Sequence, residues 1–240
     1  MQPNVTDIWV YLAQTPLLWL TATLVIYELA DIVYRRIGQW PPANPVLISV
    51  VILITFLTLT GTPYQRYFDG AQFVHFLLGP TTVALALPLW RYARRLRRML
   101  APLCGALLIG SLTSIVTVVI LSRLFGVSDI TLRSLIPRSV TTPIAMGISE
   151  QIGGLPSLTA ALVIMTGIIG AVIARDLCDR LRIDDQAARG LAIGVASHGI
   201  GTARAFQMNP EAGAFAGLAM GLNGALTTLL APLLARLLGL

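Results

Sequence analysis

The chain has 240 residues, of which 55% are hydrophobic and only 12% are charged. A soluble domain carries about 25% charged residues, so this composition excludes a soluble globular protein and indicates a membrane protein. The net charge of +6 comes entirely from arginine, because the sequence contains no lysine. In a membrane protein such charge is typical of cytoplasmic loops.

Long uncharged runs recur along the chain, and each is close to the ~20 residues with which an α-helix crosses the bilayer core. The runs are continuous rather than alternating, so they predict helices. We therefore expect an all-α polytopic membrane protein with about seven spans plus one re-entrant helix. The expected spans are 17 to 34, 46 to 60, 70 to 90, 100 to 122, 157 to 174, and two that start near 190 and 214.

Arginines mark the loops asymmetrically. They cluster at Arg35 and Arg36, in RYARRLRR (91 to 98) and in ARDLCDRLRIDDQAAR (174 to 189). The positive-inside rule assigns these three loops to the cytoplasm and the N-terminus to the outside. Both of the last two loops can be inside only if one element between them dips into the membrane and returns. We expect this of 136 to 153, which Pro137 and Pro143 interrupt.

With that assignment, spans starting near 46, 70 and 100 are followed by spans starting near 157, 190 and 214. Two units of three spans, 44–126 and 135–240, would have opposite orientations within one transmembrane domain. Inverted repeats with broken helices are a feature of secondary transporters.

The first predicted break lies within HFLLGPTT (75 to 82), where Gly79 and Pro80 interrupt a span. His75 precedes this break. It is either a hydrogen-bonded core residue or a group that couples protons to transport, because histidine titrates near physiological pH.

The re-entrant element contains the second predicted break. Thr142 followed by Pro143 predicts an N-cap with proline at the first helical position. The helix start could hold a carboxylate with help from Thr141, Ser139 and Arg138. The alternative is a capped short helix whose arginine reaches the membrane surface, and for Arg138 we favour that alternative.

The third predicted break lies in VASHGIGTARAFQ (195 to 207), where Gly199 and Gly201 permit an unwound turn. Such a turn could bring His198 and Arg204 to one cavity, with Ser197 and Thr202 beside them. The alternative is that the glycines only allow close helix packing around a hydrogen-bonded histidine. Intramembrane ionisable residues are functional candidates by default.

Downstream, Gly213, Gly217 and Gly221 form a small-xxx-small ridge that predicts helix packing. Asn223 lies off this ridge and could bond either a neighbouring helix or a substrate.

The sequence contains no zinc-type cluster, Walker loop or nucleophile elbow, so we expect neither an enzyme nor a metal or other cofactor. The arginine run lacks aromatic interleaving, so nucleic-acid binding is not expected.

Two long motifs, RSVTTPIAMGISEQIGG (138 to 154) and ASHGIGTARAFQMNPEAGAFAGLAMGLNGALTTLLAP (196 to 232), resemble the LrgB family, also called CidB/LrgB or YohK-like. NPVLISVVILI (44 to 54) and GAQFVHFLLGPTTVALALPLW (70 to 90) extend the likeness over nearly the whole chain. The resemblance implies a multi-pass protein of the bacterial inner membrane with a smaller LrgA/CidA-like membrane partner.

Members of this family are described as holin- or antiholin-like regulators of murein hydrolases and lysis, or as carriers of small carboxylates. From the resemblance and the polar segments, we expect a homo-oligomeric carrier of monocarboxylates such as pyruvate, glycolate or glycerate. Thr141, Thr142 and Arg204 would bind the carboxylate, and His198 would bind a second oxygen or exchange a proton. The alternative is the holin- or antiholin-like regulator.

Overall fold

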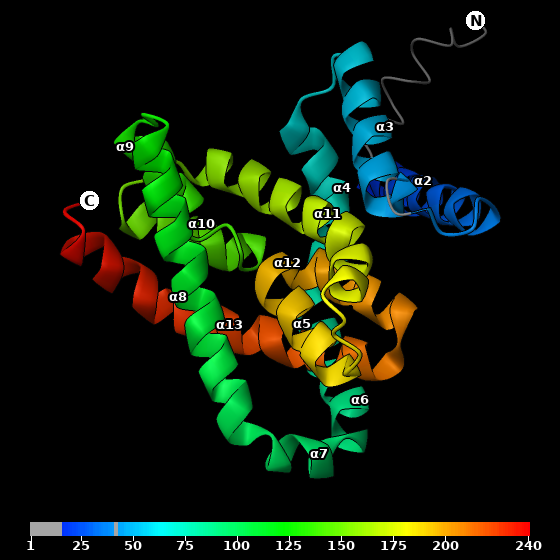
Figure 1. Cartoon of the computed structure of the whole chain (residues 1–240). Helices are drawn as coiled ribbons and strands as arrows, with labels where there is room; N and C mark the ends of the chain where they lie inside the picture. Colours follow the sequence, from blue (N-terminus) through cyan, green and yellow to red (C-terminus); the bar gives the residue numbers. More distant parts are fainter. Residues whose placement is uncertain (1–15, 41–42) are drawn as a thin grey trace, which may run out of the picture. The chain divides into compact units, whose positions relative to one another are not determined.

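The computed structural model describes residues 16–40 and 43–240. Within these ranges the secondary structure is helical, without strands. The chain divides into two compact units, residues 1–83 and 84–240, with α5 crossing the boundary. Figure 1 labels the elements, whose bounds are α2 Pro16–Arg36, α3 Pro45–Leu59, α4 Tyr64–Phe76, α5 Leu78–Ala84, α6 Ala86–Arg91, α7 Ala93–Arg98, α8 Leu100–Leu124, α9 Asp129–Leu135, α10 Thr142–Gln151, α11 Pro156–Arg180, α12 Gln186–Met208 and α13 Pro210–Leu237.

The expectation of an all-α polytopic membrane protein is confirmed. Five helical stretches in the described ranges are long and apolar enough to cross a membrane: α2, Tyr64–Arg91 (α4 to α6), α8, α11 and α13. The apolar α3 has only 15 residues. The count of seven spans and the inverted repeats therefore remain predictions.

The first unit is built around α2, which packs against α3 and α4. Trp19 on α2 is fully buried. Its ring lies edge-on to Phe56 of α3, with ring centroids 6.2 Å apart, and to Tyr67 of α4 at 5.9 Å. Aromatic pairs prefer this geometry.

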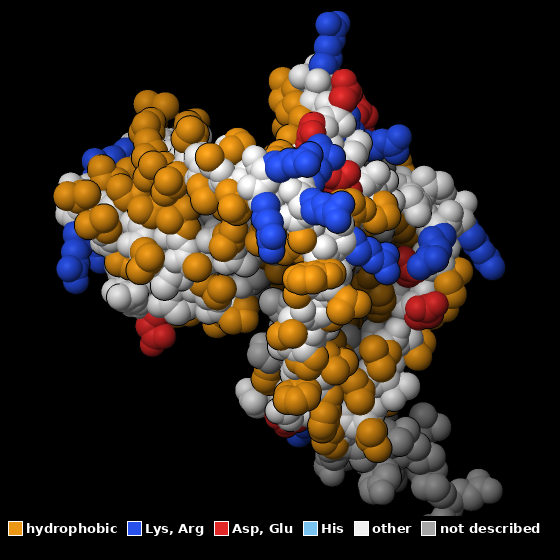
Figure 2. Space-filling view, turned by 90° about the horizontal axis from the view of Figure 1, so that it is seen from below, with side chains coloured by type: hydrophobic (Ala, Val, Ile, Leu, Met, Phe, Trp, Pro, Cys, Tyr) orange, Lys and Arg blue, Asp and Glu red, His pale blue; other side chains and the backbone are white. Residues whose placement is uncertain are grey.

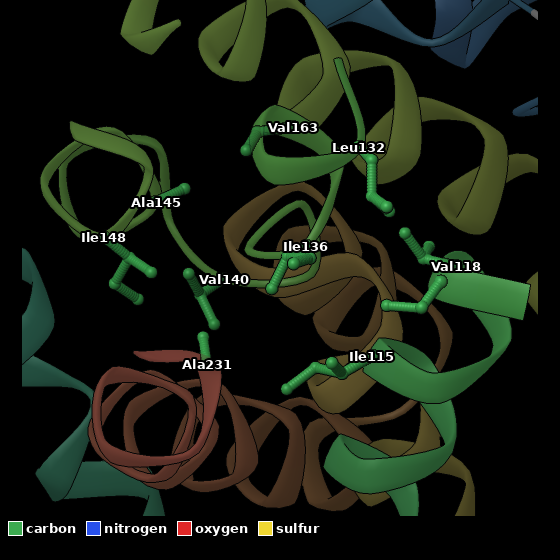
Figure 3. Packing of buried hydrophobic residues seen from close by; sticks show 10 residues of the cluster. Ile115, Val118, Leu132, Ile136, Val140, Ala145, Ile148, Val163 and Ala231 are labelled. Atoms are coloured by element: carbon green, nitrogen blue, oxygen red, sulfur yellow. The ribbon is translucent and has the colours of Figure 1, made fainter. Parts of the chain in front are cut away.

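The second unit contains a hydrophobic core between α8, the short helices α9 and α10, α11 and α13. In Figure 3, side chains from these elements point toward a shared interior. The residues shown with labels are Ile115, Val118, Leu132, Ile136, Val140, Ala145, Ile148, Val163 and Ala231.

Buried hydroxyl groups fasten α9 and α10 to α11. Thr159 donates to Ser149 at 2.7 Å, and the backbone N–H of Leu155 donates to Ser134 at 2.8 Å. All three hydroxyl residues are fully buried. The 10-residue α10 is about 15 Å long at 1.5 Å per residue, half of the ~30 Å hydrocarbon core. Its length thus fits the re-entrant interpretation of 136 to 153.

Ion pairs join two of the arginine-rich loops. Arg95 of α7 pairs with Asp185, which caps α12, and with Glu211 in the first turn of α13 at 2.6 Å. The loops 91 to 98 and 174 to 189 therefore lie at one end of the second unit. The re-entrant interpretation requires this arrangement. Which membrane side this end faces remains a prediction.

The broken helix α12 lies beside α13 (Figure 1). Small residues line their contact. A Cβ added to Gly190 would collide with the backbone of Ala212, and one added to Gly194 would collide with that of Ala216. The predicted ridge on α13 is not the contact surface throughout, because nothing lies within 4 Å of a Cβ at Gly221. Close approach is provided mainly by the glycines of α12.

Apolar side chains cover broad areas of the face shown in Figure 2, whereas the charged side chains gather in groups. Exposed leucine, isoleucine and valine residues occur on α2, α3, α8, α11 and α13. Such a surface is unfavourable in water and matches a lipid environment.

Candidate functional site

The helix α12 is interrupted at His198, whose backbone has φ 40° and ψ −132°. The two halves on either side are helical, and Gly199 and Gly201 lie in the second half. The predicted break therefore exists but falls one residue earlier than expected, at the histidine itself. His198 is only 4% exposed.

Two glycines of α11 make room for this break. A Cβ at Gly167 would lie 2.7 Å from the His198 ring, and one at Gly170 would collide with the hydroxyl of Ser197. The Nε2–H of His198 donates to the carbonyl of Val163 at 2.9 Å. The interrupted turn thus rests in a notch of α11, and its imidazole is held by the backbone of that helix.

The His198 backbone predicts an unusual order of stabilities for its variants. Residues other than glycine are strained by about 1–3 kcal/mol at such angles, which exceeds the entropic cost of glycine of about 0.5–1 kcal/mol. We expect His198→Gly to be more stable than His198→Ala by about 1 kcal/mol, although both lose the bond to Val163. Denaturant titration of the purified protein in detergent measures the difference.

Ala203 provides the matched control, because it is exposed on a regular turn of the same helix. There the order should reverse, with Ala203→Gly less stable than wild type by about 0.5–1 kcal/mol. If His198→Ala were as stable as His198→Gly, the break would not lie at residue 198.

A cavity of about 970 Å³ lies between α8, α11, the first half of α12 and the segment 136–141. Its wall is mostly apolar. The polar side chains in the wall are Thr113, Ser114, Thr117, Arg138, Ser139, Thr166 and Ser197.

Arg138 supplies the charge of this cavity. Its Nη1 donates to the backbone carbonyl of Ser114 at 3.4 Å, and no acidic side chain in residues 16–40 and 43–240 pairs with it. The Ser139 hydroxyl lies 2.9 Å from that of Ser114. A partly buried cation without a carboxylate partner attracts an anion, because an unpaired charge is costly away from water.

The sequence leaves two interpretations of Arg138 open, and the favoured one sends its guanidinium to the membrane surface. The structure places Arg138 in the cavity wall. Its reach to the membrane surface remains a prediction. Its position immediately before Ser139 and the Thr-Thr-Pro sequence was the available signal.

Of the seven predicted binding residues, all within the described ranges, only Ser197 lines the cavity. Thr202 bonds the carbonyl of His198 at 2.8 Å. Arg204 is 5% exposed, and its Nη1 lies 3.3 Å from Oε1 of Gln207. His198 bonds Val163 and Arg204 bonds Gln207, and the convergence of the two side chains on one cavity remains a prediction.

The start of α10 differs by one residue from the prediction. Thr141 is the N-cap, Thr142 is the first helical residue, and Pro143 follows it. The Thr141 side chain makes no capping hydrogen bond. Both threonines are half-buried, and neither lines the cavity.

Asn223 of α13 is 1% exposed and bonds three other elements. Its Nδ2 donates to the carbonyls of Ser139 and Val195, both at 3.2 Å. Its Oδ1 accepts from Ser111 of α8 at 2.6 Å. Of the two predicted roles, the structure shows the bond to neighbouring helices.

The remaining predicted break lies between α4, which ends at Phe76, and α5, which begins at Leu78. Gly79 and Pro80 lie in the first turn of α5. The side chain of His75 lies outside the described residues, so proton coupling by His75 stays a prediction. Residues 16–40 and 43–240 contain no group of three or more His, Cys, Asp or Glu residues that could hold a metal ion.

The apolar helices long enough to cross a membrane indicate a polytopic membrane protein, and Arg138 brings a charge to the mostly apolar cavity between its helices. The LrgB-like family matches residues 23–237. The chain therefore belongs to the LrgB-like family.

Several relatives match nearly the full chain. The uncharacterized protein YwbG of Bacillus subtilis is 35% identical over 88% of this chain and 94% of its own length. The holin-like protein CidB of Staphylococcus epidermidis is 31% identical over 92% and 96%. The antiholin-like protein LrgB of Bacillus cereus is 28% identical over 94% and 98%. No solved structure matches the chain.

Proposed function

We propose that this chain is a holin- or antiholin-like protein that controls permeability of the bacterial inner membrane. The supporting observation is the similarity, over 92% and 94% of the chain, to relatives named holin-like CidB and antiholin-like LrgB. These names favour the second of the two functions expected from the sequence. The proposal includes assembly as a homo-oligomer and with an LrgA/CidA-like membrane partner.

The cavity favours a second candidate function, the carriage of small monocarboxylates such as pyruvate, glycolate or glycerate. Arg138 would neutralise the carboxylate, and Ser114, Ser139 and Ser197 would bond its oxygens. Polar groups in an otherwise apolar wall are typical of sites for small molecules. Interrupted helices beside such a site are typical of secondary transporters.

The roles predicted for Thr141, Thr142, His198 and Arg204 belong to this second candidate. None of the four lines the cavity. Their participation therefore requires a rearrangement that exposes them, such as a hinge at the His198 break. Alternating access provides a movement of this kind.

Flux through liposomes that contain the purified protein separates the two functions. A holin-like protein releases a trapped fluorescent dye and takes up labelled pyruvate and glycolate without saturation. A carrier takes up the carboxylates with saturation, discriminates between them and retains the dye. If the protein retained the dye and showed only saturable uptake, the holin-like proposal would be wrong. An antiholin-like protein is identified by adding it to liposomes that leak through a holin-like relative and measuring whether dye release falls.

A further inference from the structure

We propose that Asn223 is a positioning residue that fixes the two interrupted segments, α12 and 136–141, to each other and so holds the cavity wall in place. Both segments contribute polar residues to the cavity wall. Ser197 comes from α12, and Arg138 and Ser139 come from the segment 136–141. The cavity is the site of the second candidate function, the carriage of carboxylates. The contacts of Asn223 do not depend on what the cavity holds.

The acceptors of Asn223 identify its role. Val195 lies three residues before the break at His198. Carbonyl groups in the last turn before a helix break are the ones that side-chain donors commonly satisfy. The Asn223 amide donates to Val195 and to Ser139, at 3.2 Å in both cases. One side chain thus bridges the backbones of both interrupted segments.

The amide oxygen of Asn223 bonds a continuous helix, α8. Oδ1 of Asn223 accepts from Ser111 of α8 at 2.6 Å and lies 3.4 Å from the Thr227 hydroxyl. The helix α8 also carries Ser114, whose hydroxyl lies 2.9 Å from that of Ser139. Asn223 therefore bonds the backbone of Ser139, whose hydroxyl lies against α8.

Cysteines introduced by Ser114→Cys and Ser139→Cys form a disulfide readily only while Ser139 stays beside α8. The rate of disulfide formation therefore measures how well the segment 136–141 is held there. Hydroxyls 2.9 Å apart put the two positions within reach of a disulfide. Cys104→Ser and Cys178→Ala remove the natural thiols. In this background we measure the rate of oxidative cross-linking in membranes, without substrate or partner.

Asn223→Leu, which removes both donors, should slow the cross-link by about tenfold, the change expected for the loss of about 1.4 kcal/mol of hydrogen bonding. Asn223→Asp, which keeps the acceptor for Ser111 but removes the donors, should slow it similarly. Thr227→Val, which removes only the 3.4 Å contact, is the matched control and should leave the rate unchanged.

Cross-linking at the wild-type rate in either Asn223 variant, once that variant is present in the membrane, would overturn the inference. Equal slowing by Thr227→Val would also overturn it, because the effect would then reflect general loosening of α13. Neither result bears on flux, so a failure here is distinguishable from a failure of the proposed function.

Discussion

Gly194→Ala is expected to lower the free energy of unfolding by about 1–3 kcal/mol, the usual cost of overpacking. The added Cβ would collide with the backbone carbonyl of Ala216, which belongs to a continuous helix and cannot rotate away. Because α12 and α13 form the most extensive helix pair of the second unit, separating them should also disturb the cavity wall carried by α12. Denaturant titration in detergent measures the loss.

Gly221→Ala is the matched control for this prediction. Gly221 lies in α13, and nothing occupies the space within 4 Å of its added Cβ. Alanine favours a helix by up to about 1 kcal/mol over glycine, so this variant should be unchanged or slightly more stable. Equal effects at Gly194 and Gly221 would contradict the close contact between α12 and α13.

If the chain acts as a carboxylate carrier, the second candidate function, Arg138→Gln is expected to reduce saturable uptake into liposomes by at least about tenfold, because an ionic hydrogen bond contributes about 1.5–3 kcal/mol. Glutamine keeps a hydrogen-bond donor of similar reach but lacks the charge that pairs with the anion. Arg138→Lys should retain part of the uptake, since it keeps the charge but loses the planar fork. Initial rates over a range of pyruvate concentrations measure the effect.

Arg97→Gln controls for the general loss of a positive charge, because Arg97 is exposed on α7. Its uptake should equal that of the wild type. Unchanged uptake by Arg138→Gln would remove Arg138 from the site and, with it, the main structural support for the carrier function.

Sequence reasoning predicted most of the fold because hydrophobic length and helix-breaking residues are local signals. The start of α10 was predicted within one residue from its Thr-Thr-Pro sequence, and the break in α12 within one residue from its glycines. The error at α12 has a physical cause. The strained angles lie at His198, whose imidazole bonds Val163 of another helix, a contact that no local pattern reveals.

The site was less predictable because it depends on which faces of the helices meet. His198, Thr202 and Arg204 are all buried, yet they do not line the cavity. The glycines of α11 that receive the break, Gly167 and Gly170, were not selected from sequence. Their importance follows only from their partners on α12.

We propose that the cavity between α8, α11 and α12 admits water and attracts anions. Labelling of Thr166→Cys by a negatively charged, membrane-impermeant thiol reagent, in a background without Cys104 and Cys178, tests it most directly. Thr166 lines the cavity, whereas the neighbouring Met165 is 57% exposed outside it and provides the control as Met165→Cys. We expect fast labelling at position 166 that Arg138→Gln slows, and little labelling at position 165. Equal, slow labelling at both positions would contradict it.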